Sequence, residues 1–296
     1  MTWRALLESG KQELLKAGIA EYELDAWYLF EWTFGFSRAQ YLLLSHEEAG
    51  GAGESPASKA DFEKRLSLYR TNLWRRGRRE PLQHITGVQA FMGLEFLVDR
   101  HVLIPRQDTE TLVELVLAAY PEKEIRLLDM CTGSGCIAIS LAVLGGYSAV
   151  EAADISREAL AVAEENAKRY EARCARPRFR QSDLFAAFAK EEQFDVIVSN
   201  PPYIPSAVIE DLEPEVRDFE PRIALDGAED GLSFYRRLVA ECREHLAADG
   251  HVYVEIGCEQ GEAVKTLFLE QGYCEVSVWQ DLTGKDRVVC GRRPAA

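Results

Sequence analysis

A segment of four residues combines the side-chain and backbone groups needed to hold a planar NH2 group. It consists of Asn200, Pro201, Pro202 and Tyr203, and it follows the apolar run 194–198. Two consecutive prolines fit neither a helix interior nor a central strand, so the carbonyls of Asn200 and Pro201 are expected to remain free acceptors. With the Asn200 side-chain oxygen they can accept both hydrogens of one NH2 group, while the Tyr203 ring lies against its plane. The segment predicts a site for a planar amide or an exocyclic amine.

A turn of small residues forms a second part of the same predicted site. It reads Cys131, Thr132, Gly133, Ser134 and Gly135, and it joins the predicted strand 126–130 to a helix. Small residues at a helix N-terminus let backbone N–H groups approach a ligand closely. The turn also fits the GxGxxA fingerprint of dinucleotide-binding proteins, so on this segment alone a nicotinamide or flavin enzyme is an open alternative.

Acidic residues end the next two predicted strands. Asp154 lies 19 residues after the last glycine of the turn, where such folds hold ribose hydroxyls, and Asp183 precedes Leu184 after the following strand. Either aspartate could instead cap the helix that follows it, near Ser156 for the first and over residues 184–189 for the second.

The elements that carry these residues alternate between strand and helix over residues 106–296. The predicted strands cover residues 126–130, 178–181, 194–198, 251–256, 275–279 and 287–290, and one further strand ends at residue 153. This alternation predicts an α/β, Rossmann-like domain with a mostly parallel sheet covered by helices. Because the carboxyl ends of parallel strands meet at one edge, the small-residue turn, both aspartates and Asn200 are expected to line one crevice.

The first 105 residues have a different pattern. Leucine and aromatic residues recur at helical spacing over residues 1–80, which predicts a small helical domain with an aromatic core. Its last helix ends in four arginines, which suit a helix C-terminus or contact an acidic protein or RNA partner. These are Arg75, Arg76, Arg78 and Arg79. Residues 81–105 are extended around two glycines and predict a β-hairpin linker.

Charge and composition narrow the class of partner. Residues 1–80 hold equal numbers of acidic and basic residues, so the net charge of −15 falls on the remainder of the chain. An acidic body is a poor partner for phosphates, so we expect no direct nucleic-acid binding. Residues 210–230 hold nine acids and two arginines, and form either a solvated loop or a surface that grips a basic partner.

No targeting or metal-binding pattern is visible. Charged residues interrupt the first 16 positions, and no run approaches the ~20 apolar residues of a membrane span, so we expect a cytoplasmic protein without membrane contact. The seven cysteines are scattered without paired spacing, which predicts reduced thiols and no metal site.

Together the turn, the acids and the Asn-Pro-Pro-Tyr segment resemble the class I S-adenosylmethionine-dependent methyltransferases. Asn-Pro-Pro-Tyr marks members that methylate a planar nitrogen, in adenine or in a glutamine amide. Further segments resemble the protein-(glutamine-N5) methyltransferases of peptide chain release factors, the HemK/PrmC family. They are PLQHITG (81–87), IPRQDTE (104–110), LDMCTGSGCI (128–137), DVIVSNPPYI (195–204), LDGAEDGLSFY (225–235) and GKDRV (284–288).

The resemblance implies a fold, a cofactor and a substrate. The fold is a seven-stranded methyltransferase domain at 106–296, preceded by a helical substrate-recognition domain at 1–80 and the linker at 81–105. The cofactor is S-adenosyl-L-methionine, and the substrate is the glutamine of the Gly-Gly-Gln motif in class 1 release factors. We expect a monomer.

The resemblance also assigns roles to residues. Cofactor binding is expected at residues 131–135, Asp154, Asp183, Leu184 and Asn200, and glutamine binding and methyl transfer at residues 200–203. Cys131 departs from the family, because many members have glycine there; if its φ is negative, its backbone can still serve the cofactor. The alternatives are an adenine-N6 methyltransferase of nucleic acid and a cofactor-binding scaffold without turnover.

Overall fold

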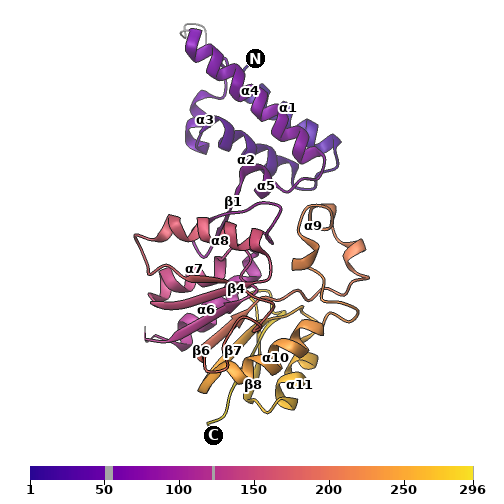
Figure 1. The fold of residues 1–296 in the computed structure, drawn as a ribbon. Helices are drawn as coiled ribbons and strands as arrows, with labels where there is room; N and C mark the ends of the chain where they lie inside the picture. The colour runs from indigo at the N-terminus through magenta and orange to yellow at the C-terminus, as the bar shows by residue number, and fades with distance from the viewer. Residues whose placement is uncertain (51–55, 122–123, 296) are drawn as a thin grey trace. The chain divides into compact units, whose positions relative to one another are not determined.

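The computed structural model describes residues 1–50, 56–121 and 124–295 (Figure 1). These residues form two compact units. One unit comprises Met1–Gly87 together with Pro214–Phe219, and the other comprises Val88–Glu213 together with Glu220–Ala296. Each unit has its own buried core.

The first unit is helical, as the leucine and aromatic spacing predicts. Its helices are α1 (Trp3–Lys16), α2 (Tyr22–Phe34), α3 (Arg38–Leu44), α4 (Pro56–Gly77), α5 (Leu82–Thr86) and α9 (Pro214–Arg217). Gly18 and Gly35 follow the first two helices with φ near +76°, a conformation that glycine adopts without steric cost. The ring of Phe30 is fully buried and contacts Trp3 edge to face at 5.9 Å, so aromatic side chains form the core.

Three of the four arginines that end α4 are paired with carboxylates of the same unit, and Arg78 lies over the ring of Trp74. Arg76 is buried and contacts Asp25 at 2.7 Å and Glu215 at 2.9 Å, and Arg79 contacts Glu215 at 2.8 Å. Arg75 contacts Glu80. α4 ends at Gly77 with Arg75 and Arg76 in its last turn, as the helix-terminus interpretation of the sequence expects. Carboxylates of the same unit account for the charges of Arg75, Arg76 and Arg79 without a contact to another molecule.

The second unit begins with a β-hairpin and continues as an α/β domain. The hairpin pairs β1 (Val88–Phe91) with β2 (Leu94–Leu97). The sheet strands are β3 (Arg126–Met130), β4 (Ala149–Asp154), β5 (Arg178–Gln181), β6 (Phe194–Ser199), β7 (Leu246–Glu255), β8 (Cys274–Gln280) and β9 (Asp286–Arg292). The helices are α6 (Glu110–Ala119), α7 (Cys136–Ser140), α8 (Arg157–Tyr170), α10 (Ser233–His245) and α11 (Gly261–Glu270), with short helical turns at Gln107–Thr109, Leu141–Gly145, Ile209–Asp211 and Arg222–Ala224.

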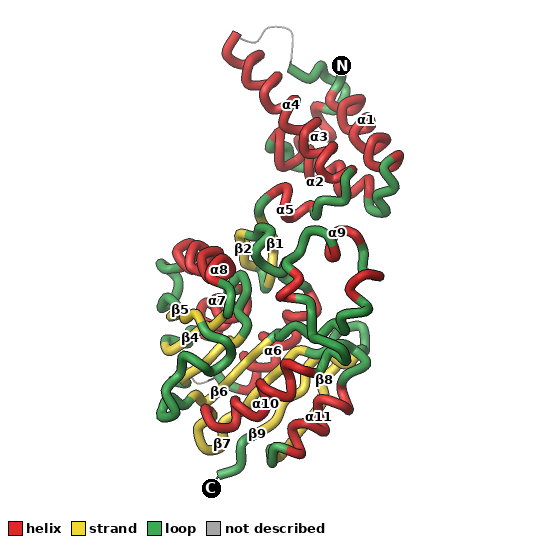
Figure 2. The backbone as a smooth tube through the Cα atoms, turned by 45° about the vertical axis from the view of Figure 1, so that its right-hand side comes forward, coloured by secondary structure: helices red, strands yellow, loops and turns green. Residues whose placement is uncertain are grey.

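The seven strands form one sheet in the order β5-β4-β3-β6-β7-β9-β8 (Figure 2). The first five of these are parallel and β9 is antiparallel to both of its neighbours, which confirms the mostly parallel sheet. Side chains alternate between the two faces along each strand: Leu127 packs in the core beneath α6, α7 and α8, and Leu128 packs in the core beneath α10 and α11. The sheet is therefore buried on both faces, as a parallel sheet requires.

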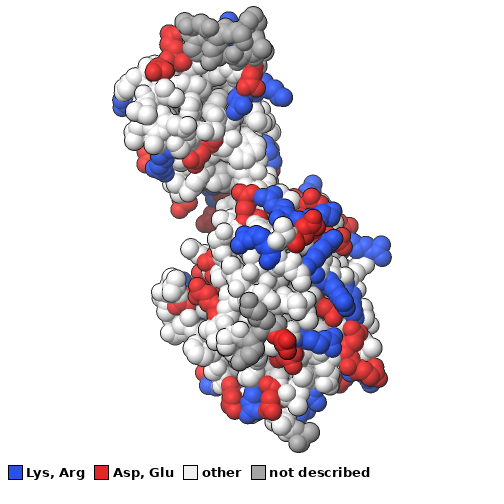
Figure 3. All heavy atoms as spheres, turned by 90° about the vertical axis from the view of Figure 1, so that its left-hand side faces the viewer, with Lys and Arg blue, Asp and Glu red and all other residues white. Residues whose placement is uncertain are grey.

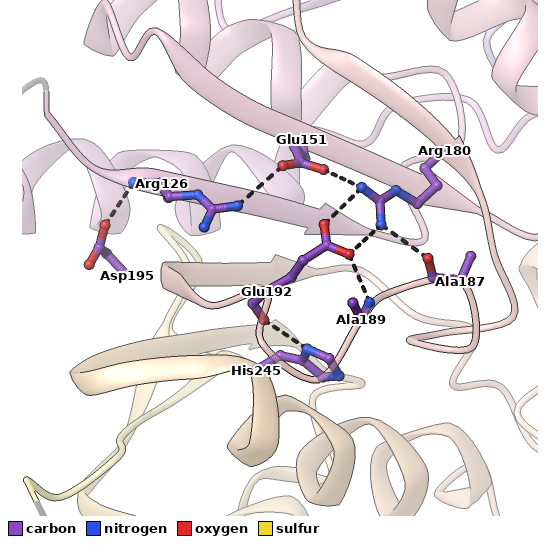
Figure 4. Close-up of polar contacts among 8 residues, drawn as sticks. All are labelled: Arg126, Glu151, Arg180, Ala187, Ala189, Glu192, Asp195 and His245. Atoms are coloured by element: carbon purple, nitrogen blue, oxygen red, sulfur yellow. Dashed lines mark hydrogen bonds and ion pairs between the residues drawn. The ribbon is translucent and has the colours of Figure 1, made fainter.

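An ion-pair network lies near the amino ends of the parallel strands, away from the edge where ligands bind (Figure 4). Arg180 on β5 contacts Glu151 on β4 at 3.1 Å and Glu192, before β6, at 2.9 Å. The Arg180 guanidinium is the main reason why the pKa of Glu192 falls to about 2. Arg126 extends the network through Glu151 at 3.5 Å, so this end of the sheet is held by charges.

Basic and acidic side chains are interspersed on the α/β unit in the face shown in Figure 3. Within the described residues, no helix combines the length and apolar character needed to cross a membrane.

The acidic stretch 210–230 is largely neutralised, because six of its nine acids contact arginines. These are Glu210, Glu215, Asp218, Glu220, Asp226 and Asp230.

Candidate active site

A cavity of about 220 Å³ lies at the carboxyl edge of β3, β4, β5 and β6. It brings together most of the residues singled out in the sequence: Cys131, Thr132, Gly133, Ser134, Asp154, Asp183, Leu184, Asn200 and Pro202. Three others, Gly135, Pro201 and Tyr203, lie next to these residues in the chain but are not part of the cavity lining. One crevice thus receives the ends of four neighbouring parallel strands.

The two glycines of the turn have different roles. Gly133 has φ +54°, and a Cβ built on it meets no atom within 4 Å, so its face opens into the cavity. Gly135 has φ +80° and precedes α7; a Cβ there would lie 3.0 Å from Ile139 and 3.1 Å from Ala163. Gly135 therefore allows α7 to pack closely on α8, while Gly133 leaves space for a ligand.

Asp154 ties the end of β4 to the glycine turn after β3. Its Oδ2 accepts a hydrogen bond from the Gly133 backbone at 2.9 Å, and its Oδ1 accepts one from Ser156 N at 2.9 Å. Burial raises the pKa of this carboxyl. The cap of α8 is Ser156, whose hydroxyl accepts from Ala159 N at 3.1 Å, so the capping role considered for Asp154 belongs to another residue.

A second buried aspartate supports the turn from inside. Asp129 on β3 is fully buried, and its Oδ2 accepts hydrogen bonds from the Thr132 hydroxyl at 2.6 Å and from Ala138 N at 3.1 Å. Burial raises the pKa of Asp129 to about 7. This residue holds the turn and the first residues of α7 together.

Asp183 lines the cavity and contacts Arg237 of α10 at 3.0 Å. The helix considered for residues 184–189 does not form; these residues make turns, so Asp183 caps no helix. Leu184 is buried, lines the cavity and has φ +44°. A leucine in the left-handed region is rare, and such conformations concentrate at functional sites.

The backbone conformation of Cys131 differs from the one expected from the sequence. The favourable case considered from the sequence was a negative φ, but the residue has φ +63°. It occupies a left-handed conformation in which a Cβ is disfavoured. The residue is partly buried, and this burial raises the pKa of its thiol, so it is a neutral group in the cavity wall. The structure thus places two non-glycine residues with left-handed backbone, Cys131 and Leu184, in the same cavity.

The four-residue segment 200–203 is anchored by groups from distant parts of the chain. The Asn200 side chain donates from Nδ2 to the Thr109 hydroxyl at 3.3 Å. The Tyr203 hydroxyl donates to Glu255 Oε1 at 3.4 Å, and the Tyr203 backbone carbonyl accepts from Gln260 Nε2 at 3.0 Å. Among the described residues, no turn or loop hydrogen bond ends at the carbonyl of Asn200 or Pro201, which agrees with their expected role as free acceptors.

Two glycines pack directly against Tyr203. A Cβ on Gly227 would lie 2.8 Å from the Tyr203 backbone, and one on Gly231 would lie 2.4 Å from the Tyr203 carbonyl oxygen. Backbone hydrogen bonds from Ile204 N to Leu225 O at 3.0 Å and from Gly227 N to Ile204 O at 2.8 Å complete the contact. The segment 225–231 thus acts as a backbone clamp on the end of the motif.

Three of these anchors, Thr109, Glu255 and Gln260, received no role from the sequence. Glu255 had a detectable signal, because it is a charged residue at the end of the otherwise apolar run 252–256. It is 1 % exposed, and burial raises its pKa to about 7. Thr109 lies in a segment noted for its resemblance, but its contact with Asn200 spans 91 positions.

Comparison with known proteins identifies the family. The PrmC N-terminal domain model matches residues 5–87, and the methyltransferase small domain model matches residues 107–211. A release factor glutamine methyltransferase of Geobacter sulfurreducens is 45% identical over 98% of this chain and 96% of its own length. The one of Caulobacter vibrioides is 40% identical over 96% of this chain and 93% of its own.

The chain belongs to the release factor glutamine methyltransferases. Its fold is also that of a solved methyltransferase of Pyrococcus furiosus, with a TM-score of 0.51 at 18% identity, over 78% of this chain and 99% of the other. The family resemblance noted in the sequence is thereby confirmed.

The cavity of this release factor glutamine methyltransferase has the groups that its cofactor, S-adenosyl-L-methionine, requires. Gly133 leaves an open face in which a side chain would stand, and it adjoins the partly buried carboxylate of Asp154. A carboxylate has acceptor sites beyond the two N–H groups it already holds, so Asp154 can also accept from ribose hydroxyls. The residues present therefore fit the cofactor, with the turn, Asp154, Asp183 and Leu184 as the groups that would hold it.

Proposed function

We propose that this protein uses S-adenosyl-L-methionine to methylate the side-chain amide nitrogen of the glutamine in the Gly-Gly-Gln motif of class 1 release factors. One observation carries the proposal: Asn200, with a hydrogen-bond acceptor unused among the described residues, lines the same cavity as Gly133 and Asp154. An acceptor for a planar NH2 group and a site for a nucleoside thus share one space. Membership of the family supplies the substrate class.

The bound cofactor supplies an electrophilic methyl group carried on a sulfonium sulfur. The task of the chain is to position a poor nucleophile, because the lone pair of an amide nitrogen is delocalised into its carbonyl. Asn200 Oδ1 and the Pro201 carbonyl accept the two amide hydrogens and favour positive charge on the nitrogen as it reacts. Holding the nitrogen in line with its target is the main catalytic resource, and the surplus proton leaves to water.

The roles of Pro202 and Tyr203 follow from their positions. Pro202 lines the cavity and gives it a rigid wall. Tyr203 is half-buried and held at both its hydroxyl and its carbonyl. We assign its ring to packing against the plane of the substrate amide at the border of the cavity. In this scheme the clamp 225–231 keeps the segment from shifting when substrate enters.

We assign recognition of the release factor to the helical unit, working with the catalytic domain as a monomer in the cytoplasm, where release factors act. Direct binding to nucleic acid has no part in this scheme, because the chain carries a net charge of −15 and an acidic protein is a poor partner for phosphates. Removal of the helical unit is expected to reduce methylation of intact release factor more than methylation of a short glutamine peptide.

The proposal is tested by incubating the full chain with methyl-labelled S-adenosylmethionine and purified class 1 release factor. Mass spectrometry of the peptide that carries Gly-Gly-Gln should show one added methyl group on the glutamine. A variant release factor with Gln→Asn at that position is the matched control and should remain unlabelled. Label transferred to duplex DNA and not to the release factor would overturn the proposal in favour of an adenine methyltransferase.

A further inference from the structure

The carbonyls of Asn200 and Pro201 depend on the two ends of their segment for their position. Proline has no backbone N–H, so neither proline of the segment can tie it to the fold through a backbone donor. Before the segment, Ser199 is paired in β6 between β3 and β7. At its other end, the Tyr203 carbonyl accepts a hydrogen bond from the side chain of Gln260. The geometry of this second anchor therefore bears directly on where the two carbonyls lie.

The side chain of Gln260 makes hydrogen bonds to backbone groups from three places in the chain. Its Nε2 donates to the Tyr203 carbonyl at 3.0 Å and to the Gly231 carbonyl at 3.3 Å. Its Oε1 accepts from the Gly257 backbone N–H at 2.9 Å. Gln260 thus joins the end of the segment 200–203, the clamp 225–231 and the loop that follows β7.

These partners allow the Gln260 amide one orientation. A backbone N–H can only donate and a backbone carbonyl can only accept, so the amide oxygen must face Gly257 and the NH2 group must face the carbonyls of Tyr203 and Gly231. An amide turned the other way would set its NH2 group against an N–H and its oxygen against two carbonyl oxygens. The hydrogen-bond pattern therefore fixes which end of the amide donates.

The backbone around the Gln260 amide has no room for further side chains. A Cβ on Gly231 would lie 2.8 Å from Gln260 Nε2, and one on Gly257 would lie 3.0 Å from Gln260 Oε1. Gln260 is the N-cap residue of α11, but its side chain makes no capping hydrogen bond. Its backbone N–H also donates to the Gly257 carbonyl at 2.9 Å, which closes the loop 257–260. The side chain is therefore held in place without serving its own helix.

We propose that Gln260 is a positioning residue for methyl transfer, which holds the Tyr203 carbonyl in place and so fixes the Asn200 and Pro201 acceptors for the glutamine amide. The proposal rests on the proposed function, because it assigns a cause to the placement which that reaction requires. Asn200 lines the cavity, whereas Tyr203 and Gln260 are not part of its lining. Gln260 thus acts on the reacting groups through the backbone between them.

The test replaces Gln260 by glutamate in the full chain, with purified release factor and S-adenosylmethionine as substrates. Glutamate has the same shape and keeps an acceptor for the Gly257 N–H, but its carboxylate has no hydrogen for either carbonyl. We expect kcat to fall about 100-fold, the scale of a slightly misplaced reacting group. The KM for release factor and the affinity for S-adenosylhomocysteine should each change less than about 3-fold, because the lost contact serves the reaction step. Gln260→Met keeps the length of the side chain, removes its hydrogen bonds without adding a charge, and should give a similar loss.

A double variant gives a readout that a general packing defect would not change. If Gln260 acts by placing Asn200, its loss should matter little once the Asn200 side chain is absent. In the Asn200→Ala enzyme, Gln260→Met should therefore lower kcat by less than about 5-fold, since effects of residues that act as a unit are not additive. A defect elsewhere in the domain would lower kcat by the same factor in both backgrounds.

The matched control is Gln271→Glu, at the other end of α11. Gln271 is the C-cap residue of the helix and is exposed. The helix dipole favours a negative charge at the N-terminus, where Gln260 lies, so the control places the same charge at the less favourable end. Its kcat should stay within about 2-fold of the wild type, as is usual for a surface substitution.

Three results would overturn the inference. They are a Gln260 variant with wild-type kcat, equal losses of kcat in the wild-type and Asn200→Ala backgrounds, and a loss of S-adenosylhomocysteine affinity in both Gln260 variants, which would assign the residue to folding. A wild-type enzyme that leaves the release factor unmethylated would instead overturn the proposed function, so the two failures are distinguishable.

Discussion

The backbone N–H of Gly133 donates to the carboxylate of Asp154 across 2.9 Å, which joins the turn after β3 to the end of β4. The contact spans 21 positions in the sequence but is short in space because β3 and β4 are adjacent and parallel. It makes the shape of the turn depend on the charge of Asp154. The first prediction follows from this dependence.

Replacing Asp154 by asparagine is expected to weaken binding of S-adenosylhomocysteine by about 10-fold or more. Both carboxylate oxygens accept backbone N–H groups, so an amide would have to place its NH2 against one of them. Hydrogen bonds to charged groups contribute ~1.5–3 kcal/mol, which corresponds to this loss. Titration calorimetry measures it, with the exposed Glu158→Gln as the matched charge change; equal affinities in both variants would contradict the assignment.

The backbone of Cys131 should make glycine more stabilising than alanine at that position. With φ +63°, an alanine keeps the left-handed strain and a glycine removes it. Cys131→Gly is therefore expected to unfold with a free energy about 1 kcal/mol higher than Cys131→Ala. At Cys136, the first residue of α7, the order should be reversed, since glycine in a helix costs up to ~1 kcal/mol relative to alanine. Denaturant unfolding of the four variants checks the sign, and the same order at both positions would be evidence against strain.

Asn200→Ala should slow methyl transfer about 100-fold or more, the scale of one lost transition-state contact. Because Gly133 and Asp154 are unchanged, cofactor affinity should stay within about 3-fold of the wild type. Single-turnover rates with release factor, together with calorimetry, separate the two effects. Near-normal turnover would exclude Asn200 as the acceptor for the glutamine amide.

Gly231→Ala is expected to damage both stability and activity. The residue has φ +71°, and a Cβ would lie 2.4 Å from the Tyr203 carbonyl oxygen, so strain and overlap together should cost ~3 kcal/mol. Gly284 has a similar φ of +82° but no atom within 4 Å of its Cβ position, so Gly284→Ala should cost only ~1 kcal/mol. Thermal unfolding and turnover of both variants distinguish overlap from backbone strain. Equal losses would mean that the clamp on Tyr203 is not tight.

Two buried acids should make the folded state less stable as the pH rises. The pKa values of Asp129 and Glu255 are raised to about 7 from about 4, so between these values the folded state binds more protons than the unfolded chain. The free energy of unfolding then decreases with increasing pH, by up to ~1.4 kcal/mol per pH unit for each group. The contribution is fully present below about pH 4 and is lost as the pH passes 7.

The measurement compares denaturant unfolding of the wild type and of Asp129→Asn/Glu255→Gln between pH 5 and 8. The double variant should lose most of the slope. An unchanged slope would show that other groups govern the pH dependence.

Local patterns in the sequence were sufficient to predict the fold and the meeting of most of the proposed cofactor-binding residues in one cavity. The turn 131–135, Asp154 and Asn200 each follow an apolar strand, and the carboxyl ends of parallel strands share one edge, so their meeting needed no knowledge of the packing. The same patterns carried the family resemblance. They could not distinguish the packing glycine, Gly135, from the open one, Gly133, since that difference depends on how close α8 lies.

The tertiary structure alone decided what lies beneath the motif and how the backbone runs through it. Thr109 and Glu255 reach Asn200 and Tyr203 across 91 and 52 positions, and no spacing rule connects residues that far apart. The left-handed φ of Cys131 is likewise imposed by the surrounding strands, because its own side chain disfavours it. The sequence by itself determined which chemistry the site can perform, through residue types at strand ends; packing between distant elements determined how the groups that perform it are held.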